Sequence, residues 1–215
     1  MRSRSTAGNG AEIVTTGVSS PGIKELVELI RTEYRFYGKD WTRPGFRAIA
    51  SYRFGVWTLD FPRQTFGEKS VAKVLDRLYL AAYRYVRNHY GIELPRRTRV
   101  GQALTLAHQG GIVIHQHAVI GDRCLIHQNV TIGNAGRGVT RDQGPVIGND
   151  VELGVGAVIL GHVKVGDGAR IGANVVVYID VPPNVTLVAN SPRLLEAPNT
   201  RAAAEAARAE KVGRE

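Results

Sequence analysis

The chain has 215 residues, of which 43% are hydrophobic, and a formal net charge of +9 at pH 7. This length supports one substantial core, or one domain with a smaller cap. The sequence has no block of five or six basic residues and no known nucleic-acid motif, so nucleic-acid binding is not expected. A single cysteine excludes an intrachain disulfide, and the lack of an 18-residue apolar run argues against a membrane-spanning helix.

The first 94 residues are predicted to form a tail and a helical domain. Residues 1–19 are rich in Ser, Thr and Gly and lack the apolar run of a secretory signal, so we expect a flexible tail and a cytoplasmic protein. Residues 20–94 contain three stretches with helical spacing of apolar residues. The first should start at a Ser20 cap with Pro21 in its first turn and end at Gly38, the second should span 45–59, and the third should span 68–90 and end at Gly91. One side of the third helix carries Val71, Val74, Leu75, Leu78, Ala82, Tyr85 and Val86.

A six-residue repeat fills the second half of the chain. Its aliphatic positions are Ile114, Ile120, Ile126, Ile132, Ile147, Leu153, Ile159, Val165, Ile171 and Val177. Hexapeptide repeats are typical of a β-solenoid with one short strand and one turn per repeat, in which the aliphatic residue points inward. A small or β-branched residue stands two positions before most of them. One of these is Cys124, which we expect to pack in the core. The solenoid is predicted over residues 95–195, and a tail or short helix over 196–215.

The repeat is interrupted twice, and both interruptions are candidate functional segments. Leu106 and Ile114 are eight residues apart instead of six, so the intervening turn should bulge outward and lift His108 off the solenoid wall. Residues 134–144 are Gly-rich and polar and cannot continue the inward pattern, so they should project as a loop. Loops on a rigid scaffold commonly carry function.

Several of these segments match a known family in sequence. They are GFRA at 45–48 followed by SYRFGVW at 51–57, the His108 turn followed by GIVI at 111–114, and the loop ending GPVIG at 144–148. With the hexapeptide repeat, they resemble the serine acetyltransferase group of hexapeptide acyltransferases, including relatives that acetylate polysaccharide sugars. The resemblance implies an α+β fold, in which an N-terminal helical domain precedes a left-handed parallel β-helix. It also implies acetyl-CoA as donor, a hydroxyl acceptor, and a homotrimer, with a dimer of trimers as the alternative assembly.

The resemblance also implies roles for particular residues. His108 matches the family's general base, a role for which a neutral imidazole is suited because its pKa lies near the working pH. The positions that match the path of CoA are Asn134, Val155, Arg170 and Ala173, and Arg193 stands near the place of the adenine. No metal is expected.

The chain departs from the serine enzymes at residues that bind the acceptor. Ala107 stands where they carry Asp, and residues 142–145 read DQGP where they carry Asp-Arg-His-Pro. Asp142 keeps the acidic member, and Arg137 or Arg141 is a possible replacement for the missing arginine. Asp40 is the nearest match to an acidic residue of their helical segment. Because a site without dedicated partners discriminates poorly for an amino acid, these losses favour a sugar acceptor. Serine is the alternative.

Three other interpretations concern His127 and the protein as a whole. His127 stands where the repeat would place a turn glycine, and it should lie near residues 107–108 of the preceding coil. It is a second catalytic candidate there, or a polar turn residue. Several histidines on a β-helix also suggest a zinc site like that of gamma-type carbonic anhydrases, but the histidine spacing does not reproduce their pattern. A non-catalytic scaffold is the third interpretation, and the retained His108 bulge argues against it.

Overall fold

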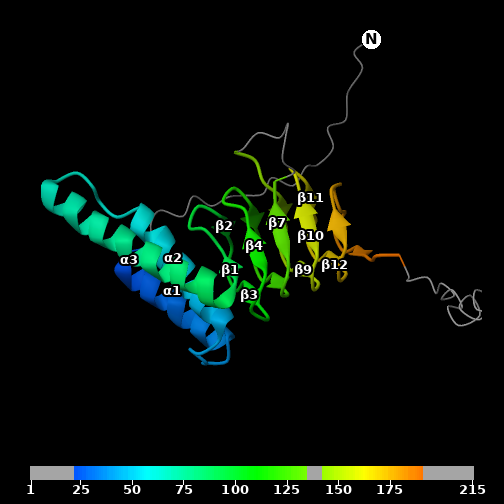
Figure 1. Ribbon diagram of the computed structural model, residues 1–215, viewed down its shortest axis with the longest axis horizontal. Helices are drawn as coiled ribbons and strands as arrows, with labels where there is room; N and C mark the ends of the chain where they lie inside the picture. Colours follow the sequence, from blue (N-terminus) through cyan, green and yellow to red (C-terminus); the bar gives the residue numbers. More distant parts are fainter. Residues whose placement is uncertain (1–21, 135–141, 191–215) are drawn as a thin grey trace, which may run out of the picture.

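The computed structural model describes residues 22–134 and 142–190, which form three helices followed by a β-helix (Figure 1). The helices are α1 (Ile23–Phe36), α2 (Pro44–Leu59) and α3 (Phe66–Tyr90). They lie at one end of the β-helix, against its first coil (Figure 1). No helix in the described part of the chain is long and apolar enough to cross a membrane.

The helix boundaries agree with the predicted ones at most ends. Gly91 ends α3 in the left-handed conformation, with φ 63°, as expected. The predicted start of α3 at residue 68 is two residues late, because Thr65 and Glu68 form a capping box that starts the helix at Phe66. The predicted Ser20 cap of α1 is wrong, since Gly22 is the N-cap; Ser20 and Pro21 lie outside the described residues.

The short strands stack into three parallel sheets. The strands are β1 (Ile92–Glu93), β2 (Arg99–Val100), β3 (Thr105–Leu106), β4 (Ile112–Ile114), β5 (Val119–Ile120), β6 (Leu125–Ile126), β7 (Thr131–Gly133), β8 (Val146–Ile147), β9 (Glu152–Leu153), β10 (Val158–Leu160), β11 (Lys164–Val165), β12 (Arg170–Ile171), β13 (Val176–Val177) and β14 (Thr186–Leu187). The sheet orders are β1-β4-β7-β10-β13, β11-β8-β5-β2 and β14-β12-β9-β6-β3. Successive strands belong to different sheets, so each set of three makes one coil of a β-helix.

The aliphatic positions of the hexapeptide repeat form the core of the coils, as predicted. In one sheet Leu106 pairs with Ile126, Ile126 with Leu153, and Leu153 with Ile171, and all four side chains are buried. Cys124 is buried as well, and burial raises the pKa of its thiol to about 11. Both facts support the packing role predicted for this cysteine.

Side chains of the helices satisfy backbone groups of the first coil, which has no preceding coil to pair with. Tyr52 Oη donates to the Thr98 carbonyl oxygen at 2.7 Å, and the Arg53 guanidinium donates to those of Val100 and Gly101. Arg53 is also paired with Glu33 at 2.8 Å, and both side chains are buried. These contacts cover edge strands that would otherwise expose unpaired backbone groups.

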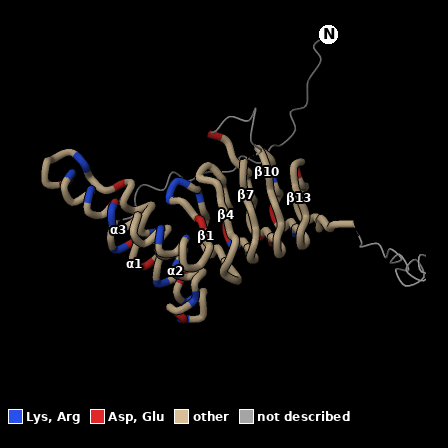
Figure 2. Tube along the Cα trace, viewed as in Figure 1, with Lys and Arg blue, Asp and Glu red and all other residues tan. Residues whose placement is uncertain are grey.

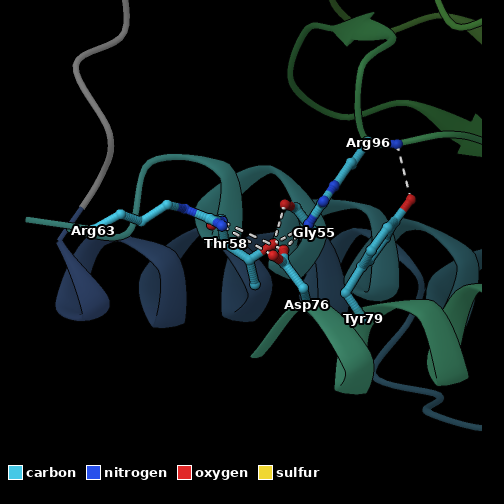
Figure 3. Close-up of polar contacts among 6 residues, drawn as sticks. All are labelled: Gly55, Thr58, Arg63, Asp76, Tyr79 and Arg96. Carbon is cyan, nitrogen blue, oxygen red and sulfur yellow. Dashed lines mark hydrogen bonds and ion pairs between the residues drawn. The ribbon is translucent and has the colours of Figure 1, made fainter. Parts of the chain in front are cut away.

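A polar cluster joins α2 and α3 to the segment that enters the solenoid (Figure 3). Asp76 accepts hydrogen bonds from Arg96 at 2.6 Å and from Arg63 at 3.0 Å. The Arg96 guanidinium lies 4.6 Å from the centroid of the Tyr79 ring, and the Arg96 backbone N–H donates to the Tyr79 hydroxyl. The cluster therefore fixes the helices relative to the first coil.

Val86 is buried as predicted, and Leu75 and Ala82 are half-buried, but the rest of the buried side of α3 differs from the predicted one. Ala72, Tyr79 and Val86 are its buried residues, at seven-residue spacing, whereas Val71, Val74, Leu78 and Tyr85 are exposed. Gly55 of α2 explains this difference, because a Cβ there would collide with the Tyr79 ring. The close approach of α2 and α3 therefore places Tyr79 on the buried side of α3.

Basic residues gather on the helices and on the segment that joins them to the solenoid, while the coils carry few (Figure 2). The positive net charge of the chain is therefore concentrated at the end of the β-helix that holds the helices.

Candidate active site

A cavity of about 630 Å³ lies between the helices and the first coil. One wall consists of Tyr37 and the start of α2, and the other comes from the β3 turn and the next coil. The lining residues are Tyr37, Arg43, Pro44, Gly45, Thr105, Leu106, Ala107, His108, Gln109 and Gln128. We call this cavity the His108 groove.

The two extra residues of the β3–β4 turn place His108 in this groove. The turn ends in Gly110 and Gly111, which have φ values of 105° and 64°. These conformations suit glycine, and a Cβ on Gly111 would collide with the Asn129 side chain. The chain therefore bulges at the predicted position, and the His108 side chain is exposed.

Tyr37 and Gly45 fix the helical wall of the groove against the strand that precedes His108. The Tyr37 hydroxyl donates to the Leu104 carbonyl oxygen at 3.1 Å and accepts from the Leu106 N–H at 2.8 Å. Burial raises the pKa of Tyr37 well above its usual value, so the hydroxyl stays neutral. A Cβ on Gly45 would collide with the Leu106 carbonyl oxygen and lie 2.9 Å from the Tyr37 ring, so this approach requires glycine.

His127 lies beside His108, as its place in the repeat predicted. The two ring centroids are 6.3 Å apart, with an angle of 35° between the ring planes. His127 Nε2 lies 3.7 Å from a carboxylate oxygen of Glu152, and the other oxygen of that carboxylate lies 3.8 Å from Arg170 Nε. The side chains of His108, His127, Glu152 and Arg170 thus follow one another along the sheet that contains β3, β6, β9 and β12.

Asp40 does not line the groove. Its carboxylate accepts hydrogen bonds from the backbone N–H and hydroxyl of Thr42 at 2.9 and 2.5 Å, and these bonds lower its pKa. It also lies 3.6 Å from Arg43 Nε. The groove instead contains Arg43, Gln109 and Gln128, which sequence reasoning did not select. In the sequence, the feature that points to Arg43 is its position directly before Pro44 and Gly45, where the segment that resembles the family begins.

The ends of the 134–144 loop are held against the coils. Asn134 Nδ2 donates to the Gln143 carbonyl oxygen at 3.3 Å, and His162 Nδ1 lies 3.2 Å from the Gly144 carbonyl oxygen. His162 is exposed, and its ring contacts the end of the loop. Asp142 is exposed and does not line the groove. Arg137 and Arg141 lie outside the described residues, as does Arg193.

The remaining positions matched to the CoA path lie on later coils. Val155 and Ala173 occupy equivalent corners of adjacent coils, where the Asn174 N–H donates to the Val155 carbonyl oxygen at 2.8 Å. Arg170 is on β12, and its side chain is 70% exposed. The roles of these residues and of Asn134 in CoA binding stay predictions.

Comparisons with known proteins agree with this architecture. Residues 144–178 match the family model described as bacterial transferase hexapeptide (six repeats). Serine acetyltransferase from Synechococcus elongatus is 34% identical over 145 residues, which cover 67% of this chain and 54% of that protein. The Salmonella typhimurium enzyme is 33% identical over 156 residues, which cover 73% and 52%. The chain thus spans about half the length of the curated relatives it matches.

Solved structures give the same family and fold. The soybean serine acetyltransferase complexed with serine is 30% identical, with a TM-score of 0.62, and the match covers 79% of this chain and 69% of that one. The Brucella abortus enzyme in complex with coenzyme A is 26% identical, with a TM-score of 0.64, and the match covers 80% and 68%. The α+β fold with a left-handed parallel β-helix is therefore confirmed. The chain belongs to the hexapeptide-repeat acyltransferase superfamily and, within it, is serine acetyltransferase-like.

Proposed function

We propose that this protein is an acetyl-CoA-dependent O-acetyltransferase in which His108 is the general base. The observation that carries the proposal is the His108 groove, where an accessible imidazole stands on the inserted turn of a serine acetyltransferase-like fold. The Tyr37 hydroxyl joins the two walls through hydrogen bonds to the backbone of Leu104 and Leu106, so the groove is formed before a ligand binds. Such preformed concave sites are typical of small-molecule binding.

The reaction needs only one proton acceptor from the chain. His108 removes the proton of the acceptor hydroxyl as its oxygen attacks the thioester carbonyl carbon, and the C–S bond then breaks. The CoA sulfur leaves and takes a proton, which the His108 imidazolium can supply. The acetyl group passes directly to the acceptor, so no covalent enzyme intermediate is required.

His127 is proposed as a second polar residue of this site. Its ring is near that of His108, and Glu152 lies on its other side. A carboxylate beside a histidine ring nitrogen orients the ring. We therefore assign Glu152 as a positioning residue that acts through His127.

Serine is the acceptor that the comparisons favour over the sugar that the sequence analysis preferred. The soybean enzyme is named in complex with serine, and the curated relatives above are named serine acetyltransferases. The substitutions at Ala107 and at residues 143–144 then mean that other residues bind the charged groups of the amino acid. A homotrimer, its pairing into a dimer of trimers and a cytoplasmic location stay predictions.

The test is release of CoA thiol from acetyl-CoA, with L-serine and a panel of sugars and nucleotide sugars as acceptors. His108→Ala is run beside the wild type. Release that depends on serine and on His108 supports the proposal, and release with a sugar alone would return the acceptor to the sugar class. If no acceptor is acetylated and calorimetry detects no CoA binding, the non-catalytic scaffold is correct instead.

A further inference from the structure

The charge of the His108 groove is set by few side chains. Among its lining residues, only Tyr37, Arg43 and His108 are ionisable. The Tyr37 hydroxyl is neutral and is used by the backbone of Leu104 and Leu106. The described lining contains no carboxylate, and Asp142 at the end of the 134–144 loop is exposed and does not line the groove. Arg43 is therefore the permanently charged side chain of the described lining, and its charge is positive.

Arg43 supplies this charge from the helical wall, while His108 stands on the solenoid wall. A carboxylate oxygen of Asp40 lies 3.6 Å from Arg43 Nε, and the same carboxylate accepts hydrogen bonds from Thr42. The terminal nitrogens of Arg43 make no other hydrogen bond or ion pair with the described residues, and the side chain is 61% exposed. Its two terminal NH₂ groups are thus available to a ligand in the groove.

The neighbouring arginines of α2 are not available in this way. Arg47 donates to the Trp41 carbonyl oxygen and to the Tyr90 hydroxyl, and Arg53 is buried against Glu33 and the first coil. Arg43 is therefore the one arginine of the described α2 region that has free donors and also lines the groove.

We propose that Arg43 is the residue that selects the acceptor, by pairing with a carboxylate while the acceptor hydroxyl reaches His108. The inference rests on the proposed function and adds the residue that determines which acceptor the site takes. A guanidinium binds a carboxylate through two parallel hydrogen bonds. This pairing strengthens binding of the acceptor and also sets its orientation. Arg43 then replaces, from the opposite wall, the loop arginine that the chain lacks. An amino acid and an acidic sugar share this chemistry.

The test compares acceptors that differ in the carboxylate. L-serine is paired with L-serinamide, and D-glucuronate is paired with D-glucose. In the wild type, kcat/KM should be at least about tenfold higher for the carboxylate member of one pair, a size expected for a hydrogen bond between charged groups. Arg43→Gln should raise KM for that member about tenfold or more and remove the preference, with little change in kcat. Arg43→Lys should recover part of the preference.

Arg35→Gln is the matched control, because it removes one exposed positive charge near the end of α1 without touching the groove. It should keep the wild-type preference. Equal preference in wild type and Arg43→Gln would overturn the inference. So would a wild type that accepts both members of each pair equally.

Failure of the proposed function is distinguished by a binding measurement. If no acceptor is acetylated, calorimetric titration of L-serine, L-serinamide, D-glucuronate and D-glucose into wild type and Arg43→Gln decides the inference separately. Carboxylate binding that requires Arg43 supports it, and binding that is absent or independent of Arg43 overturns it.

Discussion

The hydroxyl of Tyr37 accepts a hydrogen bond from the backbone N–H of Leu106, two residues before His108. A side chain at the end of α1 is thus bonded to the strand that leads into the candidate catalytic turn. The same hydroxyl donates to the Leu104 carbonyl oxygen, so one oxygen atom is hydrogen-bonded to a backbone group of β3 and to one of the residue directly before it.

Tyr37→Phe should therefore reduce both stability and activity. It leaves a buried N–H and a buried carbonyl without their partner, which costs about 1–3 kcal/mol of unfolding free energy. Chemical denaturation measures this loss, and kcat/KM should fall because the groove wall is less fixed. Tyr178→Phe is the control, since Tyr178 is 74% exposed. Equal stability of Tyr37→Phe and wild type would contradict this role.

A methyl group on Gly45 should move the helical wall. Gly45→Ala places a Cβ against the Leu106 carbonyl oxygen and the Tyr37 ring, and we expect a loss of about 2 kcal/mol or more. Gly67→Ala is the comparison, because Gly67 lies in α3 with no atom near the new Cβ, and it should stabilise by about 0.5–1 kcal/mol. Thermal melts of the two variants should move in opposite directions. A shift in the same direction would show that the groove wall tolerates the methyl group.

Loss of His108 should affect turnover and leave folding intact. His108→Ala is expected to lower kcat by about 10²–10⁴, the usual cost of removing a general base. Since the side chain is exposed, the thermal midpoint should stay within a few degrees of wild type. Near-normal kcat in the folded variant would exclude His108 as the base.

Glu152 and His127 should act as one unit. Glu152→Gln and His127→Asn are each expected to lower kcat/KM several-fold, and the double variant should lose little more than the worse single one. Additive losses would mean that Glu152 acts independently of His127. Arg123→Gln is a suitable control, because its ion pair with Asp150 is exposed and joins the same two coils as His127 and Glu152.

The Asp76 cluster of Figure 3 should make stability depend on pH. Hydrogen bonds from Arg63, followed by those from Arg96, lower the pKa of Asp76 in the folded protein. A lowered folded pKa stabilises the fold above the unfolded pKa of about 3.9, and this contribution is lost as pH falls through the folded pKa. Asp76→Asn should therefore cost about 1–2 kcal/mol at pH 7, and the difference from wild type should shrink below about pH 4.

Melts of wild type and Asp76→Asn across pH 3–7 check this dependence. Asp60→Asn serves as the control, since Asp60 is exposed and lies outside the Asp76 cluster. A constant difference between wild type and Asp76→Asn down to pH 3 would contradict the assigned role.

The repeat allowed most of the solenoid to be predicted from sequence. A period of six specifies which residues point inward, so Ile126, Leu153 and Ile171 were placed correctly without knowledge of the sheets. The two-residue insertion likewise predicted the exposed His108 turn. Both are local properties of the chain, and local spacing is what a sequence displays directly.

The helical wall of the groove was harder to predict. Asp40 was selected for its charge, but Thr42 and Arg43 hold it, and Arg43 is the residue that lines the groove. The buried side of α3 was predicted correctly only in part, for a related reason. An apolar stripe indicates that a helix packs against something. Which side of the helix becomes buried depends on contacts such as that of Gly55 with Tyr79, which join segments far apart in the sequence.

The two walls of the His108 groove come from segments 69 residues apart, joined through Tyr37 and Leu106. The coils, in contrast, each pair with the next one along the chain, and such stacked units can form in sequence from any starting point. During refolding, the β-helix can thus be complete while the helices are still undocked. Such an intermediate has native strands and no acceptor site, so activity should return later than the far-ultraviolet signal of the strands.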